Sequence, residues 1–174
     1  LPFRSGGSLC GSKLPDAQAA YETTHTLNAA LLGGVNFMLH ACGWLEGGLV
    51  SSFEKFVLDA DQLGILHHLA RGVSITENDQ ALDAIHEVGP GGHYLGCAHT
   101  QANFKEAFWR TEVLDYKPFE TWEEEGAKDS MNLAAFRVEQ MLANYQKPTL
   151  SPDISEALDA YIANKKSSMP DSFL

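Results

Sequence analysis

Basic residues are scarce in this sequence of 174 residues, which has 12 Lys and Arg against 23 Asp and Glu and a formal net charge of −11. An acidic surface repels phosphate backbones, so we expect no nucleic-acid partner. No run of about 18 apolar residues occurs, and no membrane span is expected. The first residues lack the basic stretch and apolar run of a signal peptide.

Cysteine is also rare. Cys10, Cys42 and Cys97 are an odd number and form no C-x-x-C pair, which favours a reduced, cytoplasmic protein. Apolar residues make up 44% of the chain and charged residues 20%, as in a folded globular domain rather than a disordered one. The first residue is Leu rather than Met, so we expect the sequence to begin inside a larger protein.

Hydrophobic periodicity and turn residues predict alternating strands and helices in the first half of the chain. Pro15 suits the start of a helix that ends at Gly33 and Gly34. The compact apolar run that follows these glycines reads as a buried strand. An S-x-x-E pattern at Ser51 and Glu54 predicts the N-terminus of the next helix. The predicted elements are a strand end at 1–4, a helix at 15–32, a strand at 35–41 and a helix at 51–71.

This βα order predicts an α/β fold with a parallel sheet. The second half reads differently, with a Gly/His-rich loop and several helices, two of them separated by Pro148 and Pro152. We divide the chain into residues 1–125 and a helical extension, 126–174. The predicted elements after residue 72 are a short helix at 79–88, a loop at 89–100, and helices near 101–109, 126–146 and 152–166.

Candidate site residues follow the two predicted strands. Alternation places Asn36, Met38 and His40 on one strand face, which would point into the interior if the sheet closes into a barrel. His40 then stands at the C-terminal end of its strand, where β/α barrels place their chemistry. The alternative is a hydrogen-bonded core histidine. Arg4 ends the first apolar stub and could bind a carboxylate through paired hydrogen bonds, or it could be a solvated surface arginine.

The loop after the second strand adds an aromatic and an acid. Trp44 could form the wall of a site for a cationic ligand, because an indole face attracts quaternary ammonium groups. Glu46 could supply the counter-charge. The alternatives are a tryptophan that closes the top of the core and a solvated glutamate.

Other suggestive patterns favour no catalytic or metal site. The segment GPGGHYLG lacks the G-K-[ST] of a P-loop and does not join a strand to a long helix. His93, Cys97 and His99 do not have the spacing of a standard zinc site. We therefore predict no metal ligand and no nucleophile in the chain. The acidic run Glu123–Glu125 is read as a solvated helix start.

Three segments resemble the trimethylamine methyltransferase (MttB-like) family: SKLPDAQAAYET, GGVNFMLHACGWLEGGLVSSFEKFVLDADQLG, and GPGGHYLGCAHTQANFKEAFWRTEVLDYKPFETWEEEGAKD. The resemblance covers most of the chain up to about residue 130. It implies the C-terminal part of a parallel β/α (TIM-type) barrel with additional C-terminal helices. Such a part would leave apolar faces without neighbours, so we expect a homo-oligomer.

The resemblance also implies a chemistry. Family members that demethylate trimethylamine carry pyrrolysine, whose place by resemblance falls in the loop Cys10–Lys13, and none stands there. The chain therefore resembles the branch that acts on quaternary amines such as glycine betaine. Methyl transfer to the cobalt of a partner corrinoid protein is implied, with no cofactor tightly bound to this chain. Arg4, His40, Trp44 and Glu46 would bind the substrate. A non-catalytic betaine-binding protein and an inactive fragment are the alternatives.

Overall fold

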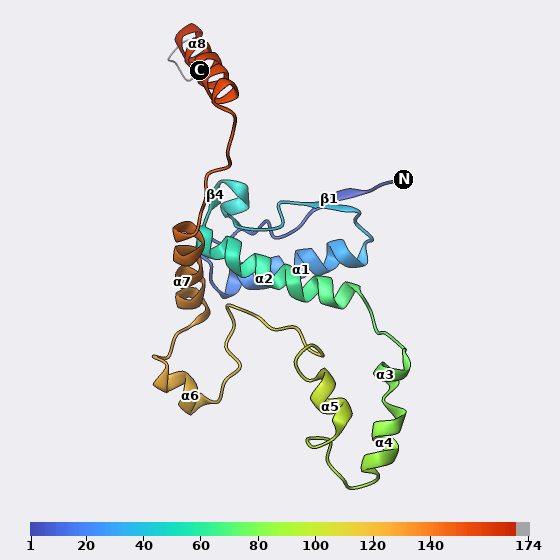
Figure 1. Ribbon diagram of the computed structural model, residues 1–174. Helices are drawn as coiled ribbons and strands as arrows, with labels where there is room; N and C mark the ends of the chain where they lie inside the picture. Colours follow the sequence, from blue (N-terminus) through green and yellow to red (C-terminus); the bar gives the residue numbers. More distant parts are fainter. Residues whose placement is uncertain (170–174) are drawn as a thin grey trace. The chain divides into compact units, whose positions relative to one another are not determined.

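The computed structural model describes residues 1–169 of the chain (Figure 1). Two short strand pairs and a set of helices follow one another along the sequence. The elements are β1 (Arg4–Gly6), α1 (Ala17–Leu32), β2 (Phe37–Leu39), β3 (Trp44–Leu45), η1 (Glu46–Gly48), β4 (Val50–Ser51), α2 (Phe53–Ala70), α3 (Glu77–Gln80), α4 (Leu82–Val88), α5 (Ala98–Asn103), α6 (Phe119–Glu124), α7 (Ser130–Ala143) and α8 (Pro152–Ser168).

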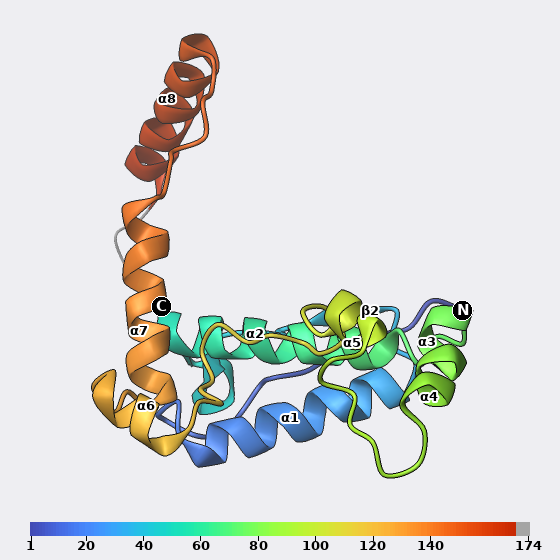
Figure 2. The ribbon, with the colours of Figure 1, turned by 60° about the horizontal axis from the view of Figure 1, so that its bottom comes forward.

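The predicted strand, helix, strand and second helix are present in the first half, but the segment between β2 and α2, predicted as a loop, forms the antiparallel β3–β4 hairpin. Strands β1 and β2 are parallel neighbours, with α1 as the connection between them. Asp16 caps α1 by accepting a hydrogen bond from the backbone N–H of Ala19, and this bond and one from Ser12 lower the pKa of the Asp16 carboxyl. Gly33 ends α1 as predicted, because its N–H bonds back to Ala29 O. Helices α1 and α2 then lie side by side (Figures 1 and 2).

Strand β2 is shorter and less buried than the prediction for 35–41. Gly34 and His40 flank it with φ values of 68° and 54°, and these left-handed conformations interrupt the extended backbone on both sides. Phe37 is 63% exposed, so one face of the strand pair is open within the described chain. The closed barrel and its extent remain predictions.

The second helix is capped by Ser52 and not, as predicted, by Ser51. The Oγ of Ser52 accepts a hydrogen bond from the N–H of Lys55 and donates one to Glu54. Ser51 is instead the last residue of β4, where it pairs with Trp44 in the antiparallel β3–β4 hairpin. The S-x-x-E spacing alone could not distinguish two adjacent serines, because the hairpin pairing that occupies Ser51 is non-local.

Beyond residue 72 the helices depart from the prediction in detail. The helix expected at 79–88 is divided by Ala81, whose φ of 52° separates α3 from α4. Helix α5 begins earlier than expected and is short. The acidic run was assigned wrongly to a helix start, since Glu123 and Glu124 end α6 and Glu125 is its C-cap. Helices α7 and α8 confirm the two predicted helices near the C-terminus.

The chain forms two compact units, Leu1–Met141 and the part from Leu142 onward. In the first unit, Val57 of α2 packs with Val113 and with Ala134 and Val138 of α7. The described part of the second unit contains α8, none of whose residues is buried. No described helix has both the length and the apolar character to cross a bilayer. The division of the chain at residues 125 and 126 stays a prediction.

Candidate functional site on β1, β2 and the loops that follow them

The candidate site begins where the two parallel strands end at one edge. Arg4 is paired with Phe37 and Gly6 with Leu39, and the pairing extends one step further through a 3.1 Å hydrogen bond from Gly7 N to Leu39 O. Because the strands are parallel, the loops that leave them emerge on the same side. The first loop leads to α1 and the second to the β3–β4 hairpin.

The register corrects the predicted place of Arg4. Arg4 opens β1 instead of ending a strand, because the pairing with Phe37–Leu39 keeps the chain extended as far as Gly6. The predicted face of Met38 is also wrong. A Cβ built on Gly7 would lie 3.0 Å from the Met38 sulfur and 2.5 Å from Leu27 Cδ2, so Met38 lies beside the fully buried Leu27 of α1, on the helix side.

His40 nevertheless lies on the same face of the strand pair as Arg4. Its left-handed backbone turns the chain just after β2, so simple alternation no longer decides its direction. A Cβ built on Gly6 would lie 3.9 Å from Cδ2 of His40. The imidazole therefore lies on the face of β1 toward which a side chain at position 6 would point. Arg4 and Gly6 are two residues apart in one strand and therefore project to one face. Both Arg4 and His40 are exposed there.

Trp44 meets His40 directly. The two ring centroids are 5.8 Å apart and the ring planes are inclined at 75°, an edge-on arrangement. Trp44 is half-buried at the start of β3, and the next residue, Leu45, is 2% exposed and packs with Cys10 and Ala19. This anchor fixes the hairpin beneath the indole. The structure thus brings two of the predicted site residues, His40 and Trp44, into contact, and the role of Trp44 as an aromatic wall stays a prediction.

Glu46 follows in η1, with a φ of 51°. Its N–H donates to Ser12 O at 2.8 Å, so the backbone at Glu46 is bound to the loop after β1. The side chain is half-buried. A role for its carboxylate as a counter-charge remains a prediction.

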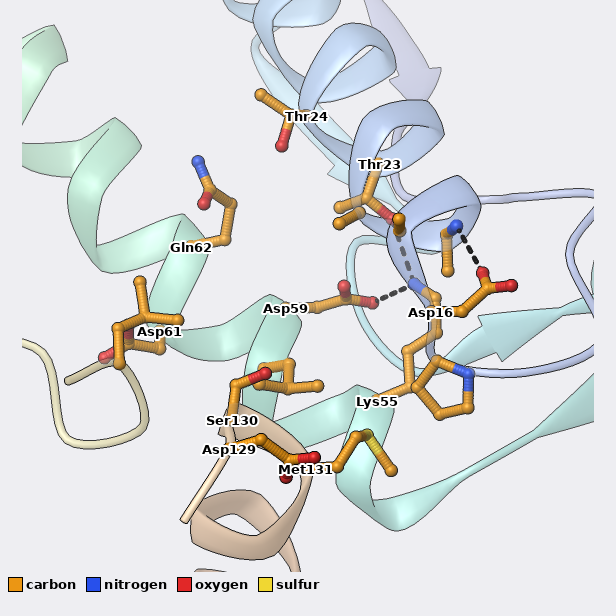
Figure 3. A pocket seen from close by; sticks show the side chains of 16 residues that line it. Asp16, Thr23, Thr24, Lys55, Asp59, Asp61, Gln62, Asp129, Ser130 and Met131 are labelled. Carbon is orange, nitrogen blue, oxygen red and sulfur yellow. Dashed lines mark hydrogen bonds and ion pairs between the residues drawn. The ribbon is translucent and has the colours of Figure 1, made fainter. Parts of the chain in front are cut away.

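A buried polar network beneath these loops was missed by the sequence reasoning. Lys55 and Asp59, one turn apart on α2, are 2% and 5% exposed, and their Nζ and Oδ2 atoms are 2.6 Å apart. Figure 3 shows the Lys55 ammonium between Asp59 and Thr23 of α1, whose Oγ1 accepts a hydrogen bond at 3.0 Å. Ser8, fully buried in the loop after β1, completes the network. A K-x-x-x-D spacing within the apolar segment FEKFVLDA was the available signal.

A cavity of about 380 Å³ adjoins this network, between α1, α2 and the start of α7 (Figure 3). Its aspartates already accept hydrogen bonds from the chain itself, and we assign it no ligand. These aspartates are Asp16, Asp59, Asp61 and Asp129.

The cysteines of the site are poor nucleophiles. Burial raises the pKa of the Cys42 thiol to about 11, and the nearby negative charge of Asp59 adds to the shift. Burial likewise raises the pKa of Cys10, whose Sγ donates to Trp44 O. Within residues 1–169, no group of three or more His, Cys, Asp or Glu side chains is arranged to hold a metal ion. His99 instead contacts the backbone oxygen of Asn78 through Nε2 at 2.6 Å.

Comparison with known proteins gives consistent matches along the chain. The family described as trimethylamine methyltransferase (MTTB) matches residues 1–170. A glycine betaine methyltransferase of Desulfitobacterium hafniense is 43% identical over 165 residues, which are 95% of this chain and 34% of that protein. A proline betaine:corrinoid methyltransferase of Eubacterium limosum is 32% identical over 167 residues, 93% of this chain and 34% of that protein.

A trimethylamine methyltransferase MttB of Methanosarcina barkeri is 30% identical over 162 residues, which are 93% of this chain and 32% of that protein. The chain therefore spans about a third of the length of the curated relatives that it matches.

Proposed function

This chain belongs to the trimethylamine methyltransferase (MTTB) family, and we propose that it takes part in methyl transfer from a betaine-like quaternary amine to the cobalt of a partner corrinoid protein. The observation that carries the proposal is the grouping of Arg4 and His40 on one strand face, with Trp44 against the histidine. These are a carboxylate-binding side chain, a polar ring and an aromatic surface. A betaine presents a carboxylate and a quaternary ammonium to match them.

Each of these side chains has a positioning task. The Arg4 guanidinium can donate two parallel hydrogen bonds to a carboxylate, which fixes the orientation of the molecule as well as its place. The Trp44 indole can face the ammonium end, where a cation–π contact in a desolvated site contributes roughly 2 kcal/mol. His40, held edge-on against Trp44, supplies a further polar contact between the two ends.

The reaction then needs no acid or base from these residues. A corrinoid presented by the partner protein would supply cobalt(I) as the nucleophile and acceptor for the methyl group. As the carbon–nitrogen bond breaks, its electron pair stays on nitrogen, and the positively charged amine leaves as a neutral tertiary amine. The chain's residues need only align the methyl group and exclude water. Raised thiol pKa values at Cys10 and Cys42 agree with the absence of a protein nucleophile from this scheme.

The experiment compares Arg4→Ala with the unchanged intact protein on two methyl donors and cob(I)alamin. Glycine betaine has a carboxylate and choline has none. Loss of a charge-assisted hydrogen bond costs on the order of 1.5–3 kcal/mol, so kcat/KM for glycine betaine should fall about 10- to 100-fold, while choline changes little.

An exposed arginine at the end of α2 gives the matched control, and Arg71→Ala should leave both donors unaffected. An equal fall in kcat/KM for both methyl donors in Arg4→Ala would show that Arg4 supports the structure and does not bind the carboxylate. Betaine binding without any methyl transfer would support a non-catalytic binding protein instead.

A further inference from the structure

One carboxylate oxygen connects the two loops that carry the candidate site. Oδ2 of Asp59 accepts hydrogen bonds from Ser8 Oγ at 2.5 Å, from Gly43 N at 2.8 Å and from Lys55 Nζ at 2.6 Å. Ser8 lies two residues after β1, and Gly43 directly precedes Trp44. A single buried acceptor on α2 is therefore bonded to both loops.

The two loop residues that donate to Asp59, Ser8 and Gly43, have positive φ values, which are found neither in strands nor in right-handed helices. Ser8 has a φ of 58° and Gly43 a φ of 83°. A left-handed conformation at a residue other than glycine costs about 1–2 kcal/mol, so Ser8 needs compensating contacts. It has them in Asp59 and in Thr26, whose Oγ1 accepts from Ser8 N at 3.1 Å.

Lys55 extends the same connection to α1. Its Nζ donates to Thr23 Oγ1 at 3.0 Å and reaches the Ser8 carbonyl oxygen at 3.5 Å. Stability alone gives little reason for a buried ion pair here, because apolar residues of similar size stabilise a core as well or better. The ion pair also provides specific positioning, because its hydrogen bonds hold particular backbone and side-chain atoms in place.

Further bonds join the loops beyond the Asp59 contact. Cys10 Sγ donates to Trp44 O at 3.2 Å, and Gly47 N donates to Cys10 O at 2.8 Å. The Trp44 backbone is thus fixed to the loop that follows the strand of Arg4. Any shift of Gly43 would move Trp44 relative to that strand.

We infer that Asp59 is a positioning residue, which locks the loops after β1 and β2 together and so sets Trp44 and His40 against the Arg4 strand. The consequence for substrate rests on the proposed function, whereas the loop geometry does not. Asp59 acts as an acceptor, and its charge is needed only to balance Lys55. An uncharged acceptor of the same shape should therefore serve when Lys55 is also made neutral.

Two double variants of the intact protein separate the acceptor from the charge. Lys55→Met with Asp59→Leu removes both, and Lys55→Met with Asp59→Asn retains an amide oxygen for Gly43 N and Ser8 Oγ. The protein is labelled with fluorotryptophan, and the Trp44 resonance is assigned by its loss in Trp44→Phe. We expect this fluorine resonance to be shifted and broadened in the double variant with Asp59→Leu (the Leu variant). In the double variant with Asp59→Asn (the Asn variant) it should return to its position in the unchanged protein.

Enzyme activity gives a second readout, in which the effect on kcat is compared with the effect on KM. In the Leu variant, kcat for glycine betaine should fall about 10- to 100-fold through lost alignment, with a smaller change in KM, and the Asn variant should recover most of it. An unchanged Trp44 resonance in the Leu variant would overturn the inference. A shifted resonance in an intact protein that transfers no methyl group would overturn the proposed function and leave the positioning role standing.

If the Leu variant does not fold, two single substitutions that each remove one hydroxyl group test the inference instead. Ser8→Gly removes a hydroxyl that contacts Asp59, Lys55 and Thr23, and Thr23→Val removes one that contacts Lys55 and Ser8 but not Asp59. The two side chains are 0% and 2% exposed. Only Ser8 belongs to a loop of the site. A Trp44 resonance displaced in Ser8→Gly but not in Thr23→Val supports the inference, and equal resonances contradict it.

Discussion

The imidazole of His40, just after β2, meets the indole of Trp44, the first residue of β3, edge-on, with 5.8 Å between ring centroids. Such ring pairs contribute about 0.5–1.5 kcal/mol beyond their buried area. The contact therefore restrains the histidine as well as shaping an aromatic surface. It makes the two side chains one unit whose parts can be tested separately.

Removal of the indole should weaken every quaternary-ammonium ligand. In Trp44→Ala we expect both glycine betaine and choline to bind about 10- to 30-fold more weakly in calorimetric titration of the intact protein, because both carry the cation. Trp122→Ala serves as the control, since Trp122 packs with Phe119 on α6 and not with the strand ends. A loss confined to glycine betaine would argue against ammonium recognition by Trp44.

Breaking the buried ion pair should cost far more stability than replacing it. Lys55→Met leaves the Asp59 carboxylate uncompensated and should lower the free energy of unfolding by about 3–5 kcal/mol. The double variant Lys55→Met with Asp59→Asn should recover most of that loss, because the amide oxygen still accepts from Ser8 Oγ and Gly43 N and no charge is left uncompensated. Urea titrations followed by circular dichroism measure both. A double variant less stable than the single one would contradict this account of the pair.

Two glycines with left-handed backbones should differ in their tolerance of a methyl group. Gly43→Ala would place a Cβ 3.2 Å from Phe56 Cβ in a buried loop, whereas Gly47→Ala meets nothing within 4 Å. Both pay about 1–2 kcal/mol for the backbone, and Gly43→Ala should lose a further 1–3 kcal/mol, roughly, through overpacking. Equal unfolding midpoints for the two variants would show that the loop at Gly43 rearranges to accommodate the methyl group.

The raised pKa of Cys42 predicts a particular pH dependence. With a pKa of about 11 against an ordinary 9.0, the thiol stays protonated in the folded chain across the range where an exposed cysteine ionises. Iodoacetamide should therefore modify Cys42 slowly at pH 9, with a rate that keeps rising toward pH 11. Mass spectrometry of the modified site measures the rate.

The same shift affects stability in a defined direction. The folded state holds the Cys42 proton more tightly than the unfolded state, so this contribution is complete below pH 9.0 and is lost as pH rises toward about 11. Cys42→Ser should show a weaker decline in unfolding midpoint over that interval. An identical decline in both proteins would locate its cause elsewhere.

Local signals were sufficient for the main helices. Apolar spacing together with Pro15, Gly33 and the serines before α2 predicted α1 and α2, because helix hydrogen bonds and caps form between residues close in sequence. The choice between Ser51 and Ser52 was the exception. It depended on the pairing of Ser51 with Trp44, a contact that the helix pattern does not contain.

The candidate site was predictable in part. That His40 and Trp44 come from one short loop follows from their spacing, and their ring contact needs little beyond the turn at His40. The position of Arg4 required the register of two strands that are more than thirty residues apart. The prediction for Met38 is wrong because the polar character of Asn36 and His40 does not decide which face of the strand meets α1, and Met38 lies beside Leu27.

The sequence by itself determined the order β1, α1, β2 and α2, the acidic charge, and the presence of an arginine, a histidine and a tryptophan in and after the first two strands. Only the tertiary structure decided which atoms hold those ends together. Asp59 meets Ser8 and Gly43 across 51 and 16 residues of chain. A hydrogen bond between such distant residues depends on distances of a few ångströms after folding, and no local pattern specifies them.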